Sequence, residues 1–592
     1  MEHLCSVQIL PLVKKRALSN DKIGAMATNS CAFSFSASLK LIDMRTEVVF
    51  FLNGQRHAVD SSGAALVLSD YLRLVCGLPG TKVVCAEGDC GACTVVCARF
   101  APAGSSRHHR DPKTQAEAQA TSNAKKQGRV EFRAINSCIV LIAQLDGCSV
   151  VTIEGLNTPS LNTPSPKTPD PQPDPSRTEI QEKLFCSHAA QCGYCTPGIA
   201  MALAGAVEKL TPQSQKLSEQ DAKNALTGNL CRCTGYAPII SAAQAIDIHQ
   251  ALTPSLHERY GTEKIAAALR RVFSQPCWLK PTVEADFEFY APLTLKAACA
   301  YLKKNPSAQI IAAGTDLGVL RNKRKQVLKK LMSLHLIKNS TRTELKRKKE
   351  LLVGCNATID DFRSSLKQAL PEFAAYLDLF ASPQIRNVAT VIGNLANASP
   401  IGDLAPPLLV LNAKLEIATD KKPRLLDLSD FFLGYRKTAL KKGQLISGLK
   451  FEIPGQGQIF KLYKVSQRKD LDISTINAAF CVQLAKERSG LMIGEARIAY
   501  GGVAAIPLRL YKLERWLSGR QILPQSLQPT IDSAIELLQS EITPISDLRA
   551  SAAYRRVVAE NLLRRYLHHL FAASLDGSVK KSRDLESPHE LS

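Results

Sequence analysis

Two groups of cysteines are the residues of this sequence whose types and spacing could do chemistry. In the first group, Cys85, Cys90 and Cys93 have the C-x4-C-x2-C spacing, and Cys138 supplies a fourth thiol further along the chain. This spacing brings three sulfurs of one loop, and a fourth from a separate element, onto the two irons of a 2Fe–2S cluster. The first group therefore predicts such a cluster.

Glycines within the first cysteine loop support this prediction. Gly88 and Gly91 let the chain curl so that backbone N–H groups approach the sulfides of a plant-type ferredoxin cluster. Two alternatives stay open, because clustered cysteines can be small buried apolar residues or can bind zinc. The Gly-Asp-Cys-Gly-Ala-Cys sequence suits neither alternative well.

The second group offers two pairs of thiols on separate segments. Cys192 and Cys195 form a C-x2-C pair, and Cys231 and Cys233 form a C-x-C pair. Pro197 predicts a helix start beside Cys195, where the partial positive charge of the helix end would favour a thiolate and an anionic cluster. We expect these thiols to bind a second 2Fe–2S cluster, and zinc is the competing metal. The other ten of the eighteen cysteines share no spacing, and packing is expected for them.

Two glycine-containing loops could bind a nucleotide cofactor. Side-chain bulk is absent where a pyrophosphate could meet backbone N–H groups, at Ala312, Ala313, Gly314 and Gly393. Thr315 and Asn394 could add hydrogen bonds. Neither loop has the G-x-G-x-x-G pattern, and by themselves such loops are more often plain turns.

The elements that must position these residues follow from hydrophobic patterning. Strands are expected at 47–52, 94–100 and 129–135, and Asn53-Gly54 predicts a hairpin turn after the first of them. Helical periodicity dominates 179–252. A charged stretch with Pro276 then leads into a mixed α/β segment from about residue 286.

The final segment alternates between the two patterns. Strands are expected at 458–465 and 496–500, and amphipathic helices at 509–518 and 552–567. The predicted organisation begins with an extension at 1–43 that is disordered or follows a misassigned start. It continues with a ferredoxin domain at 44–156 with an inserted loop at 101–128, a Pro-rich linker at 157–177, a helical 2Fe–2S domain at 178–253, a mixed α/β domain with the two glycine-containing loops at 283–456, a C-terminal domain at 458–572 and a tail at 573–592.

Composition excludes several function classes. The chain has 592 residues, 45% hydrophobic and 22% charged, which is enough for several cores. No apolar run approaches the roughly 20 residues of a membrane helix, so no membrane association is expected. The net charge of +22 is densest at 321–349, without the interleaved aromatic residues of a nucleic-acid surface, so a solvated face is expected there. Eighteen cysteines are too few for a disulfide-dense secreted scaffold, and eight of them fall into two tight groups, so metal ligation in the reducing cytoplasm fits better.

These motifs together resemble the xanthine dehydrogenase and aldehyde oxidase family of molybdenum hydroxylases. The resemblance rests on the two cysteine groups, the segment 229–236 and the segments 310–318 and 385–404, and it covers about 44–569. It implies a multidomain α+β fold: a β-grasp ferredoxin domain, a helical-bundle 2Fe–2S domain, an α+β FAD-binding domain of the PCMH or vanillyl-alcohol-oxidase-like type, and a C-terminal α+β domain of the CO dehydrogenase flavoprotein type.

The resemblance also implies which residues line the FAD. Phe380 would pack near the flavin, Lys464 would reach it from the C-terminal domain, and Tyr435 with Arg436 would lie on the side that an incoming NAD approaches. Leu471 departs from the family pattern, where relatives often carry a polar residue, and this leaves the oxidant open. The implied cofactor-binding residues are Ile310, Ile311, Ala312, Ala313, Gly314, Thr315, Asp316, Leu317, Phe380, Ala389, Thr390, Gly393, Asn394, Asn397, Asp403, Tyr435, Arg436 and Lys464.

By this resemblance the chain passes electrons through two 2Fe–2S clusters to FAD and then to NAD. The molybdenum cofactor would reside on a large partner subunit, in a heterotetramer or higher assembly, and the joining of both clusters and FAD in one chain favours hypoxanthine and xanthine as substrates. One alternative is the same subunit type in an aldehyde or N-heteroaromatic hydroxylase. An alternative of another class is a basic interaction protein whose cysteines bind zinc, and the net charge makes nucleic acid one candidate partner for it.

Overall fold

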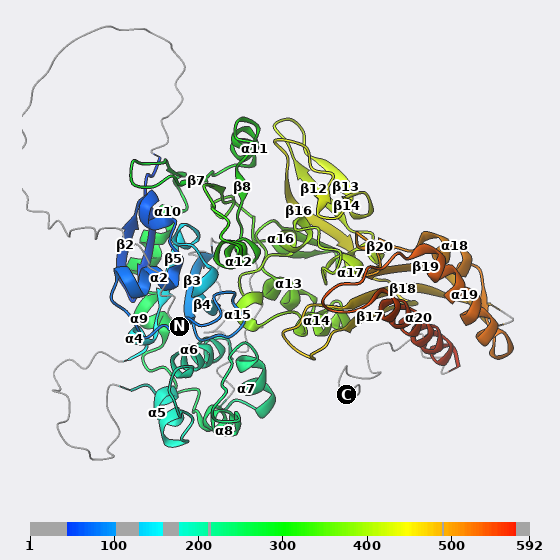
Figure 1. Cartoon of the computed structure of the whole chain (residues 1–592), viewed down its shortest axis with the longest axis horizontal. Coiled ribbons are helices and arrows are strands. Elements are labelled where there is room, and N and C mark those ends of the chain that lie inside the picture. Colours follow the sequence, from blue (N-terminus) through cyan, green and yellow to red (C-terminus); the bar gives the residue numbers. More distant parts are fainter. Residues whose placement is uncertain (1–43, 102–128, 158–176, 211–214, 488–489, 576–592) are drawn as a thin grey trace, which may run out of the picture. The chain divides into compact units, whose positions relative to one another are not determined.

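The computed structural model describes residues 44–101, 129–157, 177–210, 215–487 and 490–575 (Figure 1). The expected extension at 1–43 lies outside the described residues. The inserted loop, the Pro-rich linker and the tail lie outside them except for a few residues at their ends.

The first sheet carries the first cysteine group. Its strand order is β2-β1-β5-β3-β4, with β1 and β5 parallel and the other neighbours antiparallel. The predicted hairpin at Asn53-Gly54 joins β1 to β2, and the three predicted strands are each found within a residue of their expected bounds. The strands are β1 (Val48–Leu52), β2 (Gln55–Val59), β3 (Thr94–Ala101), β4 (Arg129–Asn136) and β5 (Cys148–Val151).

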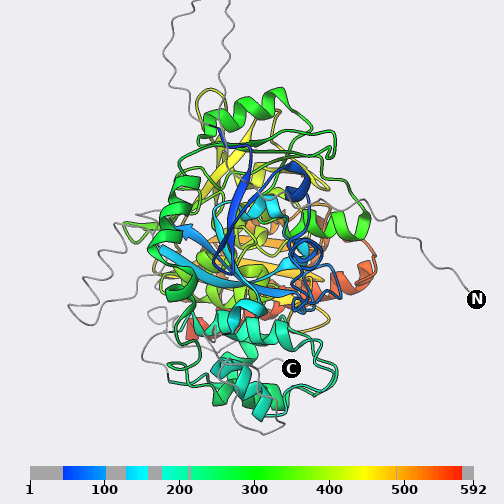
Figure 2. The same cartoon turned by 90° about the vertical axis from the view of Figure 1, so that its left-hand side faces the viewer.

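Helices of the second cysteine group pack onto this sheet (Figure 2). The apolar helix α6 is buried against β3 and β4, and its residue Gly205 approaches the backbone of Ala134 so closely that a Cβ would lie 2.8 Å from the Ala134 nitrogen. The helices are α5 (Glu179–Cys186), α6 (Thr196–Val207), α7 (Glu219–Leu226) and α8 (Ala237–Ala245).

The charged stretch before residue 286 contains helices and a strand that its sequence pattern did not predict. It forms α9 (Leu256–Tyr260), α10 (Glu263–Val272) and β6 (Cys277–Leu279), because α10 is amphipathic and buries an apolar face. Strand β6 pairs with β7 (Glu288–Ala291), and the sheet continues through β9 (Lys330–Met332) to β8 (Gln309–Ile310) in the order β6-β7-β9-β8. The first strand of that sheet, β6, thus precedes residue 283, where the FAD-binding domain is expected to begin.

A second sheet and its helices complete the predicted FAD-binding segment. The sheet has the order β10-β11-β16-β12-β13, and one hydrophobic core joins it to the helices that follow. Its strands are β10 (Thr343–Lys346), β11 (Glu350–Gly354), β12 (Lys414–Ala418), β13 (Arg424–Asp427) and β16 (Leu445–Glu452). The helices are α13 (Ile359–Leu366), α14 (Pro371–Asp378), α15 (Pro383–Arg386), α16 (Val391–Ala396) and α17 (Ala405–Val410).

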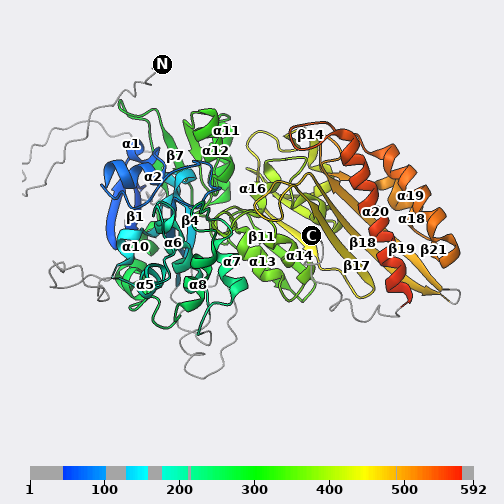
Figure 3. The same ribbon diagram turned by 60° about the horizontal axis from the view of Figure 1, so that its bottom comes forward.

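The C-terminal segment is an antiparallel sheet covered by three helices (Figure 3). The strand predicted at 458–465 is β17, and the helix predicted at 552–567 extends to Leu575, with the rings of Phe480 and Tyr566 stacked between sheet and helix at 4.2 Å. The main elements are β17 (Gln458–Val465), β18 (Ile476–Glu487), β19 (Gly490–Gly501), α18 (Tyr511–Leu517), α19 (Leu527–Glu541) and α20 (Ala552–Leu575). Within the described ranges, no helix is long and apolar enough to cross a membrane.

Candidate iron–sulfur and flavin sites

The first cysteine group, which we call the inner site, is Cys85, Cys90, Cys93 and Cys138. The loop curls around the Cys85 sulfur, which accepts hydrogen bonds from the backbone nitrogens of Glu87 (3.5 Å), Asp89 (3.4 Å) and Cys90 (3.4 Å). Backbone N–H groups directed at a sulfur stabilise negative charge on it, as a cluster ligand requires.

The four thiols of the inner site interact with one another. Hydrogen bonds from Cys138 and Cys90 lower the pKa of the Cys85 thiol, and the same contacts raise the pKa of both partners. A hydrogen bond from Cys138 also lowers the pKa of Cys93. Among the described residues, no three or more His, Cys, Asp or Glu side chains are arranged to hold one metal ion. A 2Fe–2S cluster needs two thiolates for each iron, and interacting pairs supply that chemistry.

The second group, which we call the outer site, is Cys192, Cys195, Cys231 and Cys233. Here too the sulfurs pair, with 3.6 Å between those of Cys192 and Cys233 and a hydrogen bond between Cys195 and Cys231. As predicted, Cys195 precedes α6, with Pro197 in the first turn. Burial and a hydrogen bond with Cys231 raise the pKa of the Cys195 thiol to about 12, so the effect expected of the helix end stays a prediction. Burial also opposes charge on Cys231, but hydrogen bonds from Thr234 lower its pKa.

Backbone contacts join the two cysteine loops. The Leu230 nitrogen donates to the Cys90 carbonyl oxygen at 3.0 Å, and the Asn229 side chain donates to the Gly91 carbonyl oxygen at 3.1 Å. Gly91 has a φ of +68°, and a Cβ there would lie 2.1 Å from the Gly228 carbonyl oxygen. Only glycine allows both this conformation and this approach.

Residues of the predicted FAD-binding segment cover the inner site. The buried Gln384 of α15 donates to the Asn229 side chain at 2.7 Å. Val319 and Ile385 pack against the apolar cluster of Cys93, Cys138 and Ile139. Sequence analysis missed these residues, because ordinary Gln, Val and Ile carry no motif that marks them.

The first predicted FAD loop links a strand to a helix. Ile310 ends β8 (Gln309–Ile310), Ile311 is buried, and Gly314 precedes α12 (Thr315–Arg324) with a φ of +68°. A Cβ on Gly314 would lie 2.9 Å from the Gln144 side chain, which itself donates to the Ala312 carbonyl oxygen at 3.1 Å. Asp316 is exposed and Thr315, Ala313 and Leu317 are half-buried. The loop thus lies against the sheet that carries the inner site.

The second predicted FAD loop faces the first across a cavity. Ala312, Ala313 and Thr390 line this cavity together with Asn356, whose buried side-chain nitrogen has no hydrogen-bond partner within the structure. The buried side-chain oxygen of Asn394 is also without a partner. The orphaned Asn356 nitrogen suits a polar group in this cavity, whose volume of about 90 Å³ would take only a part of a cofactor as large as FAD.

Other groups of the second loop are used within the chain. Thr390 accepts a hydrogen bond from the Gly393 nitrogen at 3.0 Å, so this N–H caps the short helix α16 instead of facing a phosphate. Ala389 is buried, and the Asn397 nitrogen donates to the Gly393 carbonyl oxygen at 3.1 Å. The Gly393 N–H is thus engaged within the chain, and the expected role of Gly393 at the cofactor stays a prediction.

Asp403 and Lys464 come together from two segments. Their side chains form a buried ion pair of 2.9 Å, and Lys464 also donates to the Leu379 carbonyl oxygen, beside Phe380, at 3.2 Å. Ser474 and Asn477 donate to the other Asp403 oxygen at 2.5 and 2.9 Å. Asn477 retains a buried side-chain oxygen without a partner, which is a further orphaned acceptor at this junction.

Tyr435 and Arg436 lie apart from these contacts. They form the turn between β14 (Phe432–Gly434) and β15 (Lys437–Thr438), where both are exposed. Leu471 occupies another turn, with a φ of +58°. The roles expected of these three residues remain predictions.

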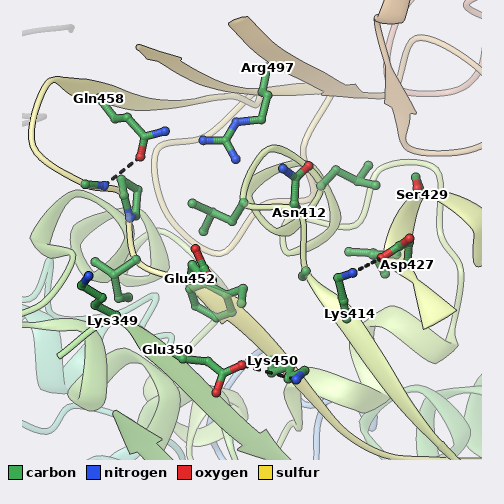
Figure 4. Close-up of a pocket in the computed structure, with 18 of the residues that line it drawn as sticks. Lys349, Glu350, Asn412, Lys414, Asp427, Ser429, Lys450, Glu452, Gln458 and Arg497 are labelled. Atoms are coloured by element: carbon green, nitrogen blue, oxygen red, sulfur yellow. Dashed lines mark hydrogen bonds and ion pairs between the residues drawn. The ribbon is translucent and has the colours of Figure 1, made fainter. Parts of the chain in front are cut away.

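A cavity of about 1170 Å³ lies elsewhere, beside β12, β16 and β19 (Figure 4). Its charged groups largely pair with one another, as Lys450 does with Glu350 at 3.4 Å and Lys414 with Asp427 at 3.2 Å. None of the described residues lining it is a predicted cofactor residue. Three predicted cofactor residues, Ala312, Ala313 and Thr390, instead line the smaller cavity between the two FAD loops.

Comparisons with known families agree with this arrangement. Residues 152–244 match the family described as 2Fe-2S binding domain, residues 285–455 match the FAD binding domain in molybdopterin dehydrogenase, and residues 461–570 match the CO dehydrogenase flavoprotein C-terminal domain. Together with the observed sheets and helices, these matches define a multidomain α+β iron–sulfur flavoprotein of the oxidoreductase class.

The relatives support a more particular family. Xanthine dehydrogenase of Emericella nidulans is 29% identical over 90% of this chain and 39% of that protein. Xanthine dehydrogenase of Oryza sativa subsp. japonica is 29% identical over 80% of this chain and 36% of that protein. The chain thus spans about two fifths of the length of these curated relatives. The chain is thus similar to the iron–sulfur and FAD-binding portion of molybdenum hydroxylases.

Among solved structures, the reconstituted CO dehydrogenase from Oligotropha carboxidovorans is similar to part of the chain. It is 26% identical, and the match covers 48% of this chain and 96% of that chain with a TM-score of 0.43.

Proposed function

We propose that this chain is the electron-transfer subunit of a molybdenum hydroxylase and that its substrates are hypoxanthine and xanthine. Electrons pass from the outer site to the inner site and then to FAD. The observation that carries this order is the contact between Leu230 and the Cys90 carbonyl oxygen, together with the packing of Val319 and Ile385 on the inner site. The inner site thus contacts both the outer site and the FAD-binding segment.

The outer site supports a partner at the entry of this path. Cys192 and Cys233 are exposed, and so are the neighbouring large apolar side chains of Tyr194, Leu230 and Tyr236. Exposed apolar groups around a redox centre suit a docking face for a large subunit that carries the molybdenum cofactor. We propose a heterotetramer or higher assembly of the two subunits in the cytoplasm.

At the other end, the chain's own groups fit FAD. When bound, a flavin accepts single electrons from clusters and delivers pairs of electrons to an acceptor. Asn356, Asn394 and Asn477 offer buried polar atoms that have no hydrogen-bond partner in the structure. The buried Asp403–Lys464 ion pair would add fixed charges beside the cofactor. Tyr435 and Arg436, exposed on one turn, would receive NAD as the electron acceptor.

The names of the relatives favour xanthine among possible substrates, and an assay of the assembled complex tests this choice. Oxidation of xanthine to urate is the expected result. If xanthine is inert while an aldehyde or nicotinate is oxidised, the substrate proposal fails and the subunit assignment stands.

Quantification of iron, sulfide, zinc and flavin in the purified chain tests the assignment itself. We expect two 2Fe–2S clusters and one FAD for each chain, with the absorption bands of both cofactors. Zinc without iron or flavin would contradict the proposal and favour a zinc-containing interaction protein.

A further inference from the structure

Helix α12 lies directly against the ligands of the inner site. The side-chain nitrogen of Asn322 on this helix donates two hydrogen bonds, to the carbonyl oxygen of Ala86 at 2.9 Å and to that of Cys138 at 2.8 Å. Ala86 follows the ligand Cys85, and Cys138 is itself a ligand. One amide group therefore joins the cysteine loop to the separate element that supplies the fourth sulfur.

The approach of this helix is close along its length. Gly318 faces the helical turn η2 (Ser137–Ile139), and a Cβ on Gly318 would lie 2.3 Å from the Ile139 carbonyl oxygen. Val319 packs on Cys93 and Cys138. A movement of α12 would therefore displace residues of the inner site, because close-packed groups transmit strain to their neighbours.

The same helix begins at the first predicted FAD loop. Gly314 is its N-terminal cap, and Ala312 and Ala313 precede it at the wall of the FAD cavity. Asn322 stands two turns further along α12. A change in the FAD loop is thus connected through one short rigid helix to two carbonyl groups of the inner site.

We infer that Asn322 is a positioning residue that couples the FAD loop to the geometry of the inner cluster, an inference that rests on the proposed function. Its amide N–H₂ group can satisfy two carbonyl oxygens at once, which a carboxylate cannot do because it has no hydrogen to donate. Through this link, FAD in its cavity keeps Cys85 and Cys138 in the arrangement that holds the cluster.

Electron paramagnetic resonance of the reduced full-length protein, with and without FAD, tests the coupling. In the wild type we expect removal of FAD to broaden the inner-site signal. In Asn322→Ala the signal is expected to be broadened already, and FAD removal should add nothing. In Asn322→Asp the added negative charge should also shift the reduction potential of the inner site to a more negative value.

Two internal controls accompany the variants. The outer-site signal should be unchanged in each, and Lys323→Gln, which alters an exposed neighbour paired with Glu87 at 3.6 Å, should leave the FAD dependence intact. If Asn322→Ala does not fold, its outer-site signal and its FAD content will be lost. The isosteric variant Asn322→Asp then tests the inference in its place. Inner-site signals and potentials equal to wild type in both variants would overturn the inference. Absence of any 2Fe–2S signal in the wild type would instead overturn the proposed function.

Discussion

The inner and outer sites use the same four-thiol chemistry in opposite surroundings. At the inner site Cys93 and Cys138 are 1% and 2% exposed, and segments from three parts of the chain cover them. At the outer site Cys192 and Cys233 are exposed beside large apolar side chains. This difference agrees with the proposed electron path, in which the outer site exchanges electrons with a partner and the inner site exchanges them within the chain.

The first way to break this comparison is to remove one site. Cys90→Ser is expected to abolish the inner cluster and block flavin reduction by substrate in the assembled complex, because a serine hydroxyl is a poor substitute for a thiolate ligand. Electron paramagnetic resonance and stopped-flow absorption measure the two effects. In Cys233→Ser, the matched variant, the outer signal should be lost and the inner one kept. Unchanged cluster signals in Cys90→Ser would refute the ligand assignment.

The second way is to weaken the attachment of the FAD-binding segment, whose residues cover the inner site, to the first sheet. Arg133 of β4 pairs with Asp361 of α13 at 2.7 Å, and both side chains are buried. Asp361→Asn should lower the free energy of unfolding by about 3 kcal/mol, because it leaves the Arg133 charge buried with weaker compensation. Urea unfolding measures this loss.

The matched control is Asp286→Asn, which removes an exposed pair with Lys329. It should lower the free energy of unfolding much less than Asp361→Asn does, because an exposed ion pair contributes little to stability. Equal effects of the two variants would mean that the Arg133–Asp361 pair does not hold the FAD-binding segment on the first sheet.

Acid offers a third test, through the sheet that carries the inner site. Burial opposes charge on Asp146, but hydrogen bonds from His335 and Arg45 lower its pKa from 3.8 to about 2. Such a depressed pKa adds stability that is present above about pH 4 and is lost as the pH falls toward about 2, amounting to about 2 kcal/mol.

Asp146→Asn should therefore unfold at lower urea concentration than wild type at pH 7. Because Asn does not titrate, the gap between the two proteins should narrow as the pH falls from 4 toward 2. A gap that is independent of pH would contradict the depressed pKa.

The smallest expected effect concerns the surface of the outer site. Leu230 is 50% exposed, and Leu230→Ser should weaken binding of the molybdenum subunit about tenfold, or about 1.4 kcal/mol, through loss of apolar contact. The backbone contact from residue 230 to Cys90 is retained in this variant. Leu425→Ser on β13, with 51% exposure, is the matched control. Equal binding by both variants would place the partner elsewhere.

Sequence reasoning could predict the parts of this molecule that are local. Spacing alone brought Cys85, Cys90 and Cys93 to one loop, and alternation located β17 at its observed bounds. The contacts of Asn322 and Gln384 could not be predicted, because they depend on how distant segments pack. The amphipathic helix α10 was not predicted, because its apolar residues lie within a charged stretch and its buried face depends on packing with the sheet.

Power saturation of the flavin radical signal in the wild type, Cys90→Ser and Cys233→Ser proteins tests the order of the two sites most directly. A nearby reduced cluster speeds the relaxation of the flavin radical. We predict that fast relaxation is lost in Cys90→Ser and kept in Cys233→Ser. Loss in Cys233→Ser with retention in Cys90→Ser would contradict the proposal that the inner site is the partner of the flavin.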